Sequence, residues 1–300
     1  MPYSSGLLDL KEKSESQIQD LFQLAHKIKK SARAGTPRFL GLTAALLFLE
    51  PSTRTRFSFE TACARLGVHP LILSGNDGTS AIKGESFEDT VLNMQSMNPE
   101  LFIIRCGDDY SLKEMSLMTK KPVINAGWGL KGHPTQALLD AFCWQEQVTA
   151  PVRGQRLLIV GDVKHSRVAA SHQELAQILG YEVAFCGPKE FLPEIDSKIQ
   201  TFSLLSEGLK WANAVMALRV QLERHSAKIS LESYKEQYQL NKKSLETLGS
   251  NSLIFHPGPV NYGIELDILV SKDSRCRILN QVEHGVWLRQ ALLQKVLEGV

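Results

Sequence analysis

Residues 48–56 read Phe48-Leu49-Glu50-Pro51-Ser52-Thr53-Arg54-Thr55-Arg56, at the point where an apolar run meets a helical pattern. The apolar run, residues 44–49, is short and ends at breaking residues, which is typical of a buried strand. Apolar residues then recur at helical spacing from Phe59 to Leu66, and Gly67 ends the pattern. The stretch therefore predicts a strand, a tight turn and a helix.

The predicted turn has the composition of an anion site. Ser52 lies at the N-cap position, and Thr53, Arg54 and Thr55 fill a first helical turn whose N–H groups lack helical partners. The positive end of the helix dipole, hydroxyl groups and a guanidinium would surround one small volume that suits a phosphate dianion. An ordinary capped helix with surface arginines would use the same residue types. The stretch alone leaves both interpretations open.

Length and composition limit the class of protein. The chain has 300 residues, of which 43% are hydrophobic, enough for two α/β domains. Its 34 basic and 32 acidic residues give a net charge of +2. The sequence has no basic stripe, so a nucleic-acid partner is not expected. The 5 cysteines are scattered without a CxxC pair, which predicts free thiols rather than a zinc site or a disulfide framework.

The hydrophobic pattern predicts a cytoplasmic protein without a membrane partner. The N-terminal residues lack the apolar core of a signal peptide, and no apolar run is long enough to span a bilayer.

Short apolar runs alternate with helical patterns along the whole chain. This rhythm predicts an α/β fold with parallel sheets. We expect two three-layer α/β domains with a cleft between them. We expect the first domain to cover residues 1–149, completed by a last helix within 276–300, and the second to cover 150–275, because Ala150 to Gly154 breaks the pattern. The fingerprint G-x-G-x-x-G is absent, so a nicotinamide cofactor is not expected.

Several motifs resemble those of the aspartate/ornithine carbamoyltransferase family. Phe48-x-Glu50-x-Ser52-Thr53-Arg54-Thr55 is similar to its carbamoyl-phosphate motif, and His133-Pro134-Thr135-Gln136 and His256-Pro257-Gly258 follow in the family's order. The resemblance implies that the first domain binds carbamoyl phosphate and the second binds the amine acceptor. The carbamoyl-phosphate residues implied in this way are Ser52, Thr53, Arg54, Thr55, Ser80, Lys83, Arg105, His133, Gln136, Pro257 and Gly258.

The resemblance also implies catalytic roles, which it gives to Arg54, Thr55, Lys83, Arg105 and His133. In the family, the arginine matched by Arg105 contacts the carbonyl oxygen and the phosphate, and the glutamine matched by Gln136 holds the amino group. The imidazole N–H of His133 would polarise the carbonyl and stabilise the oxyanion that forms on attack. No metal and no cofactor is expected.

Ser80 and Lys83 lie in a polar, glycine-containing loop. Read alone, the segment is a surface loop. The resemblance implies that the loop reaches the active site of a neighbouring subunit, and hence a homotrimer with shared active sites. A higher assembly with a regulatory chain or a dihydroorotase-like partner is left open.

The resemblance gives the aspartate-binding role to Lys83, Arg167, Arg219 and Gln221. Two guanidinium forks suit a dicarboxylate, because each matches one carboxylate. Glu50 stands where the ornithine enzymes have lysine, and residues 256–259 read His-Pro-Gly-Pro instead of His-Cys-Leu-Pro. Both differences favour L-aspartate, with N-carbamoyl-L-aspartate and phosphate as products in pyrimidine biosynthesis.

Three positions depart from the pattern of the family's aspartate enzymes. Cys106 stands where histidine is usual, Trp128 replaces a carboxylate at the expected rim of the site, and Tyr262 replaces an arginine. Two alternatives stay open. One is a transcarbamylase for another amino acid acceptor. The other is a non-catalytic paralogue acting as a structural partner, for which Trp128 and Tyr262 are the only support.

Overall fold

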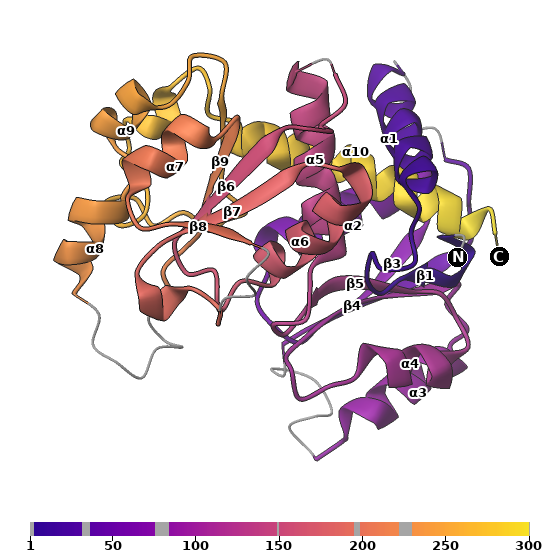
Figure 1. The fold of residues 1–300 in the computed structure, drawn as a ribbon. Coiled ribbons are helices and arrows are strands. Elements are labelled where there is room, and N and C mark those ends of the chain that lie inside the picture. Colours follow the sequence, from indigo (N-terminus) through magenta and orange to yellow (C-terminus); the bar gives the residue numbers. More distant parts are fainter. Residues whose placement is uncertain are drawn as a thin grey trace. The chain divides into compact units, whose positions relative to one another are not determined.

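The computed structural model describes residues 3–31, 37–75, 84–148, 150–194, 199–221 and 230–299. These residues form two compact units (Figure 1). Unit 1 is Met1–Phe142 with Val282–Val300, and unit 2 is Cys143–Gln281. Each unit contains one five-stranded sheet.

The sheet of unit 1 has the strand order β1-β5-β4-β2-β3, and its ladders are parallel. Its strands are β1 (Gly6–Leu7), β2 (Thr43–Phe48), β3 (His69–Ser74), β4 (Leu101–Cys106) and β5 (Val123–Trp128). The central strands β2, β4 and β5 are almost entirely buried, whereas the edge strand β3 is half-exposed. This is the pattern expected of a parallel sheet covered on both faces.

Helices cover both faces of this sheet. They are α1 (Glu15–Lys30), α2 (Thr53–Leu66), α3 (Phe87–Ser96), α4 (Leu112–Thr119), α5 (Pro134–Val148) and α10 (Ile278–Leu297), after a 3-10 turn at Tyr3–Ser5. Helices α3 and α4 pack their apolar residues against one face of β2 and β4. Helices α1, α2, α5 and α10 lie on the other side (Figure 1). Unit 1 therefore has three layers.

Local sequence signals set the helix ends. Ser14 and Gln17 form a capping box at the start of α1. Gly67 ends α2 in the left-handed conformation with a φ of 79°. The predicted strand, turn and helix around residues 48–56 are confirmed, because β2 ends at Phe48 and α2 begins at Thr53.

The sheet of unit 2 has the order β10-β9-β6-β7-β8 and is also parallel. Its strands are β6 (Arg156–Val160), β7 (Glu182–Cys186), β8 (Gln200–Phe202), β9 (Ala214–Ala217) and β10 (Leu253–Phe255). Its helices are α6 (Arg167–Leu179), α7 (Leu205–Trp211), α8 (Leu231–Tyr238) and α9 (Lys242–Thr247), with 3-10 turns at Lys189–Phe191 and Val270–Lys272.

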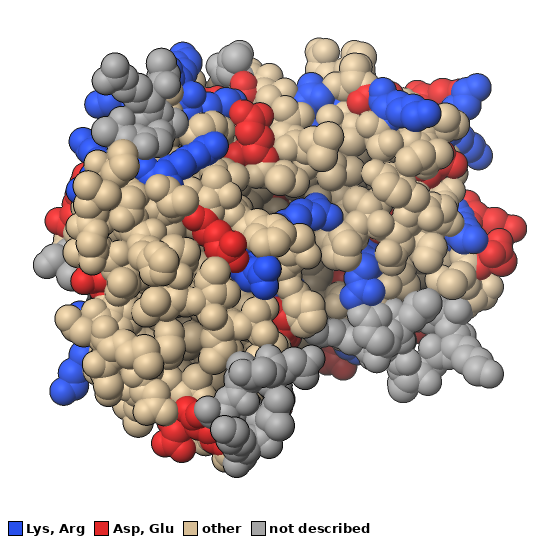
Figure 2. Space-filling view, turned by 180° about the vertical axis from the view of Figure 1, so that it is seen from behind, with Lys and Arg blue, Asp and Glu red and all other residues tan. Residues whose placement is uncertain are grey.

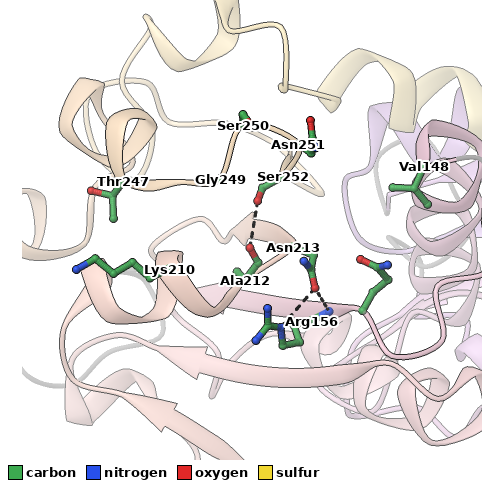
Figure 3. A pocket seen from close by; sticks show the side chains of 11 residues that line it. Val148, Arg156, Lys210, Ala212, Asn213, Thr247, Gly249, Ser250, Asn251 and Ser252 are labelled. Carbon is green, nitrogen blue, oxygen red and sulfur yellow. Dashed lines mark hydrogen bonds between the residues drawn. The ribbon is translucent and has the colours of Figure 1, made fainter.

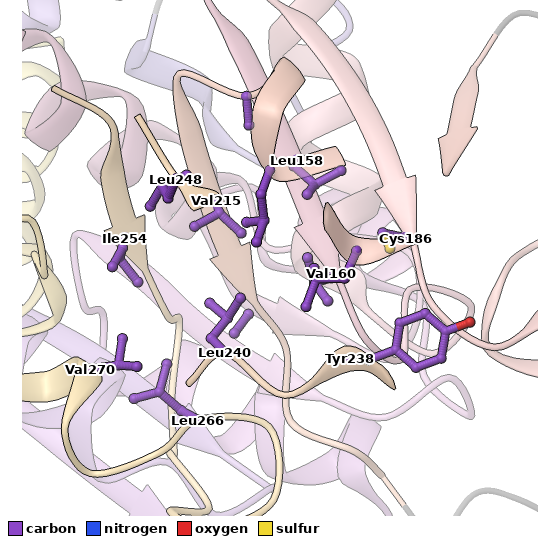
Figure 4. Close-up of a cluster of buried hydrophobic side chains, with 14 of the residues drawn as sticks. Leu158, Val160, Cys186, Val215, Tyr238, Leu240, Leu248, Ile254, Leu266 and Val270 are labelled. Carbon is purple, nitrogen blue, oxygen red and sulfur yellow. The ribbon is translucent and has the colours of Figure 1, made fainter. Parts of the chain in front are cut away.

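Alternate residues of these strands form the main core of unit 2 (Figure 4). Leu158, Val160 and Val215 point to the face covered by α7 and α8, which contributes the buried Tyr234 and Tyr238. The period of two along each strand sends the intervening residues to the face where α6 packs. The predicted α/β class with parallel sheets is confirmed in both units.

The chain passes between the units within helices. The division falls after Phe142, inside α5, and after Gln281, inside α10. The sequence suggested boundaries at 149/150 and 275/276, because Pro151 and Gly154 break the helical pattern. These residues follow the end of α5, and continuous helices leave no composition shift at the division itself.

Candidate active site

Three central strands of unit 1 bring the turn at residues 52–55, Arg105 and His133 to one edge of the sheet. The chain leaves β2 toward β3 on one side and returns to β4 on the other side, so the sheet has a switch point between β2 and β4. Ligands of open α/β sheets bind outside the carboxyl ends of strands at such a point. The 52–55 turn follows β2, Arg105 lies at the end of β4, and His133 follows β5.

The first turn of α2 differs from an ordinary helix start. Ser52 occupies the N-cap position, but its side chain makes no capping hydrogen bond. The side chains that cap α1, α3 and α6 do accept such bonds. The Ser52 hydroxyl is thus not used to satisfy the helix, as the anion-site interpretation requires.

Two arginines of this turn have different surroundings. Arg56 pairs with Glu60 at 3.0 Å and donates to the Ser74 hydroxyl at 3.1 Å, so it is tied to the edge strand β3. Arg54 is half-buried in the same turn. Arg56 is half-buried as well, and its side chain is tied to Glu60 and Ser74, so it is the matched control for Arg54.

Arg105 is held at the switch point by its neighbours. Its Nη2 lies 3.5 Å from the Glu50 carboxylate, and its Nη1 donates to the Ala126 carbonyl at 3.3 Å. Glu50 follows β2 and Ala126 lies on β5, so the guanidinium is fixed from both sides.

Thr55, His133 and Gln136 are buried and lie close together. The Thr55 hydroxyl is 3.4 Å from His133 Nε2. Gln136 Nε2 donates to the Asp140 carboxylate at 2.8 Å. Because a carboxylate only accepts, this bond turns the amide oxygen of Gln136 away from Asp140 and leaves it to accept from a ligand.

Unit 2 has an equivalent switch point between β6 and β9, where the chain reverses its direction across the sheet. Arg167 begins α6 after β6, and Arg219 and Gln221 follow β9. Gly161 shapes this turn. Its φ is 114°, and a Cβ would lie 2.9 Å from the Leu218 carbonyl oxygen, so only glycine fits.

Asp162 connects the segments that carry the residues predicted to bind aspartate. This fully buried carboxylate accepts from the Gln221 backbone N–H at 3.3 Å and lies 2.9 Å from His165 Nδ1. The Gln221 side chain donates to the His165 carbonyl at 2.9 Å. The segments after β6 and β9 are therefore joined at one sheet edge.

The loop that carries Pro257 and Gly258 follows β10 at the same edge of unit 2. His256 is fully buried beneath it. Its Nδ1 accepts from the Gly258 N–H at 2.8 Å, and its Nε2 lies 3.0 Å from Glu265 Oε1. These bonds fix the path of the loop and thus the place of its backbone carbonyls.

The remaining residues singled out from the sequence are either outside the described part of the chain or lie elsewhere than expected. Ser80 and Lys83 lie outside the described residues. Trp128 does not line a site rim, because its indole is buried in the core of unit 1 and donates to the Tyr110 carbonyl at 2.7 Å. The indole therefore joins the end of β5 to the segment that carries Tyr110. Tyr262 is 48% exposed.

Sequence reasoning missed two buried charges behind the site, Asp140 and Arg289. Asp140 had a usable signal, since it is the one acidic residue in the apolar run 137–144 and lies one helical turn after Gln136. Arg289 had none, because its partners are distant in the sequence.

A hollow in unit 2 is separate from these residues (Figure 3). It has a volume of about 530 Å³, and Arg156, Asn213 and Ser252 line it. These residues lie at the amino ends of β6, β9 and β10, opposite the edge that carries Arg167 and Arg219. The hollow is therefore not part of the candidate site.

Surface charge is mixed on the face seen in Figure 2, where basic and acidic side chains are interspersed. Within the part of the chain that the structure describes, no helix is long and apolar enough to cross a membrane. Among the same residues, no group of three or more His, Cys, Asp or Glu side chains could hold a metal ion.

The two sheet edges define a class of protein. One carries the predicted anion-binding turn and the other carries Arg167 and Arg219, as expected from the sequence for an α/β enzyme. Residues 6–146 match the aspartate/ornithine carbamoyltransferase carbamoyl-P binding domain, and residues 153–296 match the Asp/Orn binding domain of the same family. The chain belongs to the aspartate/ornithine carbamoyltransferase family.

Individual relatives agree with this membership. The aspartate carbamoyltransferase catalytic subunit of Chlorobium phaeovibrioides is 38% identical, over 98% of each chain. The structure of aspartate transcarbamoylase from Trypanosoma cruzi with carbamoyl aspartate and phosphate is 26% identical, with a TM-score of 0.84 over 96% of this chain and 94% of that one. Ornithine carbamoyltransferase from Thermus thermophilus is 25% identical, with a TM-score of 0.84 over 97% and 98%.

Proposed function

We infer that this chain transfers the carbamoyl group of carbamoyl phosphate to the α-amine of L-aspartate, giving N-carbamoyl-L-aspartate and phosphate. The observation that carries this inference is the phosphate-type turn at the β2–β4 switch point, in a chain that aspartate carbamoyltransferase catalytic subunits match over nearly their whole length.

The donor half of the reaction is assigned to unit 1. Ser52, Thr53 and Arg54 hold the phosphate through hydroxyls, helix N–H groups and a guanidinium. Ser80 and Lys83 add to this binding in our proposal. Thr55, Arg105 and His133 polarise the carbonyl, Gln136 accepts from the amino group, and the Pro257 and Gly258 carbonyls accept from the same nitrogen.

The chemistry is a direct acyl transfer. The neutral α-amine forms a bond to the carbamoyl carbon, a tetrahedral intermediate places negative charge on its oxygen, and the bond to the phosphate oxygen breaks. Donors aimed at the oxyanion stabilise it more than the substrate. The amine proton passes to the departing phosphate, or to the Lys83 amine where that amine is unprotonated. No covalent enzyme intermediate is needed.

The acceptor half is assigned to Arg167, Arg219 and Gln221, with Lys83. Two guanidinium groups at the β6–β9 switch point fit the two carboxylates of aspartate better than the single carboxylate and ammonium of ornithine. Glu50 supports this choice, because its pairing with Arg105 at 3.5 Å is a contact that a lysine could not make.

We propose a homotrimer in which Ser80 and Lys83 enter the active site of the neighbouring subunit, working in the cytoplasm in pyrimidine biosynthesis. The support is the match of these residues to the family's motif. Association with a regulatory chain or a dihydroorotase-like partner is left open by these motifs.

The experiment compares Arg54→Ala with its matched control Arg56→Ala. Phosphate release from carbamoyl phosphate is followed with L-aspartate and, in parallel, with L-ornithine. We expect phosphate release with aspartate. The rate should fall roughly 100-fold or more in Arg54→Ala, because this change removes a donor to the leaving phosphate. In Arg56→Ala the rate should change within about twofold. Release with ornithine alone would refute the acceptor assignment. No binding of carbamoyl phosphate would favour the non-catalytic paralogue.

A further inference from the structure

Arg289 is a buried arginine that lies behind the candidate site in unit 1. Its side chain comes from α10 and is 3% exposed. Nη1 donates to the Ser58 hydroxyl on α2 at 2.6 Å, and Nη2 donates to the Thr135 hydroxyl on α5 at 3.3 Å. One guanidinium therefore joins the two helices that begin with the phosphate turn and with His133.

The surroundings of Arg289 are shaped to receive it. Its guanidinium stacks over the Phe59 ring, 5.0 Å from the centroid. Gly285 lies one turn earlier on α10, and a Cβ there would come 2.9 Å from Arg289 Nη1 and 3.1 Å from Leu139 Cδ2. A larger residue at Gly285 would displace the guanidinium or the leucine.

This charge is costly to bury. Burial lowers the pKa of Arg289, the Asp140 carboxylate opposes that shift, and Arg105 adds to it. A well-packed apolar residue is often as stable as a buried ion pair, or more so. A stabilising role alone is therefore a poor account of this side chain.

Hydrogen bonds lead from Arg289 to the residues that would hold the carbonyl. The Ser58 hydroxyl, which accepts from Arg289, donates to the Thr55 carbonyl at 2.9 Å. The Thr55 hydroxyl in turn lies 3.4 Å from His133 Nε2. Thr135, the other acceptor, lies between His133 and Gln136 in the chain. The guanidinium thus fixes the spacing of Thr55 and His133.

A second connection runs through Asp140. The carboxylate of Asp140 attracts Arg289 and accepts from Gln136 Nε2 at 2.8 Å. That bond sets which end of the Gln136 amide faces the site. Arg289 therefore also bears on the amide oxygen that would accept from the carbamoyl nitrogen.

We propose that Arg289 is a positioning residue for the side chains that bind the carbamoyl group, whereas Ser52, Thr53 and Arg54 bind the phosphate without its help. The inference rests on the proposed function, because it assumes that carbamoyl phosphate is the ligand. It predicts that a mutation can weaken binding of the carbamoyl group without weakening binding of the phosphate.

The test uses Arg289→Met, Arg289→Lys and the milder Ser58→Ala. Lysine keeps the charge but cannot reach both hydroxyls as a planar fork does. Ser58→Ala cuts the connection to Thr55 and leaves Arg289 in place, so it remains informative if Arg289→Met fails to fold. The matched control is Arg65→Met, because Arg65 of α2 also stacks on a ring of α10, 4.0 Å from the Trp287 centroid.

Equilibrium binding is measured first, with inorganic phosphate and carbamoyl phosphate as probes. In Arg289→Met and Ser58→Ala we expect the Kd for phosphate to stay within about twofold and the preference for carbamoyl phosphate over phosphate to fall toward one. Arg289→Lys should be intermediate, and Arg65→Met should keep the preference. An unchanged preference in folded Arg289→Met and Ser58→Ala would overturn the proposal, and so would equal losses of both affinities.

Turnover is the second measurement. We expect kcat to fall roughly 100-fold in Arg289→Met, as for a small misplacement of reacting groups, with KM for aspartate little changed. A kcat equal to that of the native chain would also overturn the proposal. An inactive native chain that still prefers carbamoyl phosphate, with the preference lost in Arg289→Met, would refute the proposed reaction and support the positioning role.

Discussion

His256 holds the loop that carries Pro257 and Gly258 through both ring nitrogens. Because Nδ1 accepts from the Gly258 N–H, the ring is neutral and its proton is on Nε2, facing Glu265. Glu265 Oε1 also accepts from the Asn261 N–H at 2.6 Å. One imidazole and one carboxylate therefore fix both ends of the turn.

At the residue scale we predict that His256→Leu destabilises unit 2. The change leaves the buried Glu265 carboxylate and the Gly258 N–H without this partner, which costs about 1–3 kcal/mol for each such group. Urea unfolding measures the loss. Tyr262→Arg in the same loop is the control, since Tyr262 is 48% exposed and should change stability little. Equal stability of His256→Leu and the native chain would contradict this account of the loop.

A residue of the site could be predicted from the sequence when the residues that it acts with lie close to it in the chain. Ser52 to Thr55 and His133 to Gln136 form compact motifs, so the sequence shows them directly. Arg289 bonds residues that lie 231 and 154 positions away, and no local pattern reports such a contact. Trp128 was misplaced at a rim because a departure from a motif does not show where the new side chain packs.

At the scale of elements, the starts of α1 and α2 differ. Ser14 caps α1 with its side chain, which accepts from the Gln17 N–H at 3.2 Å, whereas Ser52 makes no capping bond. We predict that Ser14→Ala lowers the free energy of unfolding by about 1 kcal/mol. Ser52→Ala should leave stability almost unchanged and weaken phosphate binding. Thermal unfolding and phosphate titration measure the two effects. A stability loss in Ser52→Ala equal to that in Ser14→Ala, with unchanged phosphate binding, would favour the ordinary capped helix.

Arg275 ties the end of α9 to the segment before α10. Its fork bonds Asp273 at 2.9 and 3.0 Å and donates to the Leu245 and Leu248 carbonyls at 3.0 and 2.9 Å. The bond from Arg275 lowers the pKa of Asp273 below its ordinary value of 3.8.

Because this carboxyl has a lower pKa in the folded state, its stabilising effect is present above the ordinary pKa and disappears as pH falls through the folded value. We predict that Asp273→Asn is less stable than the native chain at pH 7 and that the difference shrinks below pH of about 4. Denaturant unfolding across pH tests this, with Asp267→Asn as the control. A difference that is constant across pH would contradict the linkage.

Elements with a clear apolar run or helical pattern could be predicted, whereas two of the shortest strands could not. The last helix expected within residues 276–300 matches α10. Strands β1 and β8 have 2 and 3 residues, too few for any periodicity to show. Tertiary pairing, with β5 and β7, makes them strands.

At the scale of the whole molecule, the predicted trimer has a specific consequence. If Lys83 acts in the neighbour's site, a chain with Arg54→Ala and a chain with Lys83→Ala are each inactive alone. Mixed, dissociated and reassembled, they should form some sites with both residues intact and recover part of the activity. Light scattering should give about three times the chain mass of 33.4 kDa. A monomer, or mixtures that stay inactive, would contradict shared sites.

The fold of the whole molecule does not choose the acceptor. The aspartate enzyme of Trypanosoma cruzi and the ornithine enzyme of Thermus thermophilus both align with a TM-score of 0.84. In the proposed function the choice is assigned to a few side chains, chiefly Glu50, Arg167 and Arg219. The sequence could therefore predict the class of reaction and the acceptor, while the fold alone supports only the class.

The most direct test of the central claim is the identity of the carbamoylated product. Carbamoyl phosphate labelled with ¹³C at its carbonyl is incubated with the purified chain, L-aspartate and L-ornithine together, and the products are read by NMR. We predict a single enzyme-dependent product, N-carbamoyl-L-aspartate, formed with one phosphate for each carbamoyl group transferred. A signal from citrulline, or loss of carbamoyl phosphate at only its uncatalysed rate, would contradict the account.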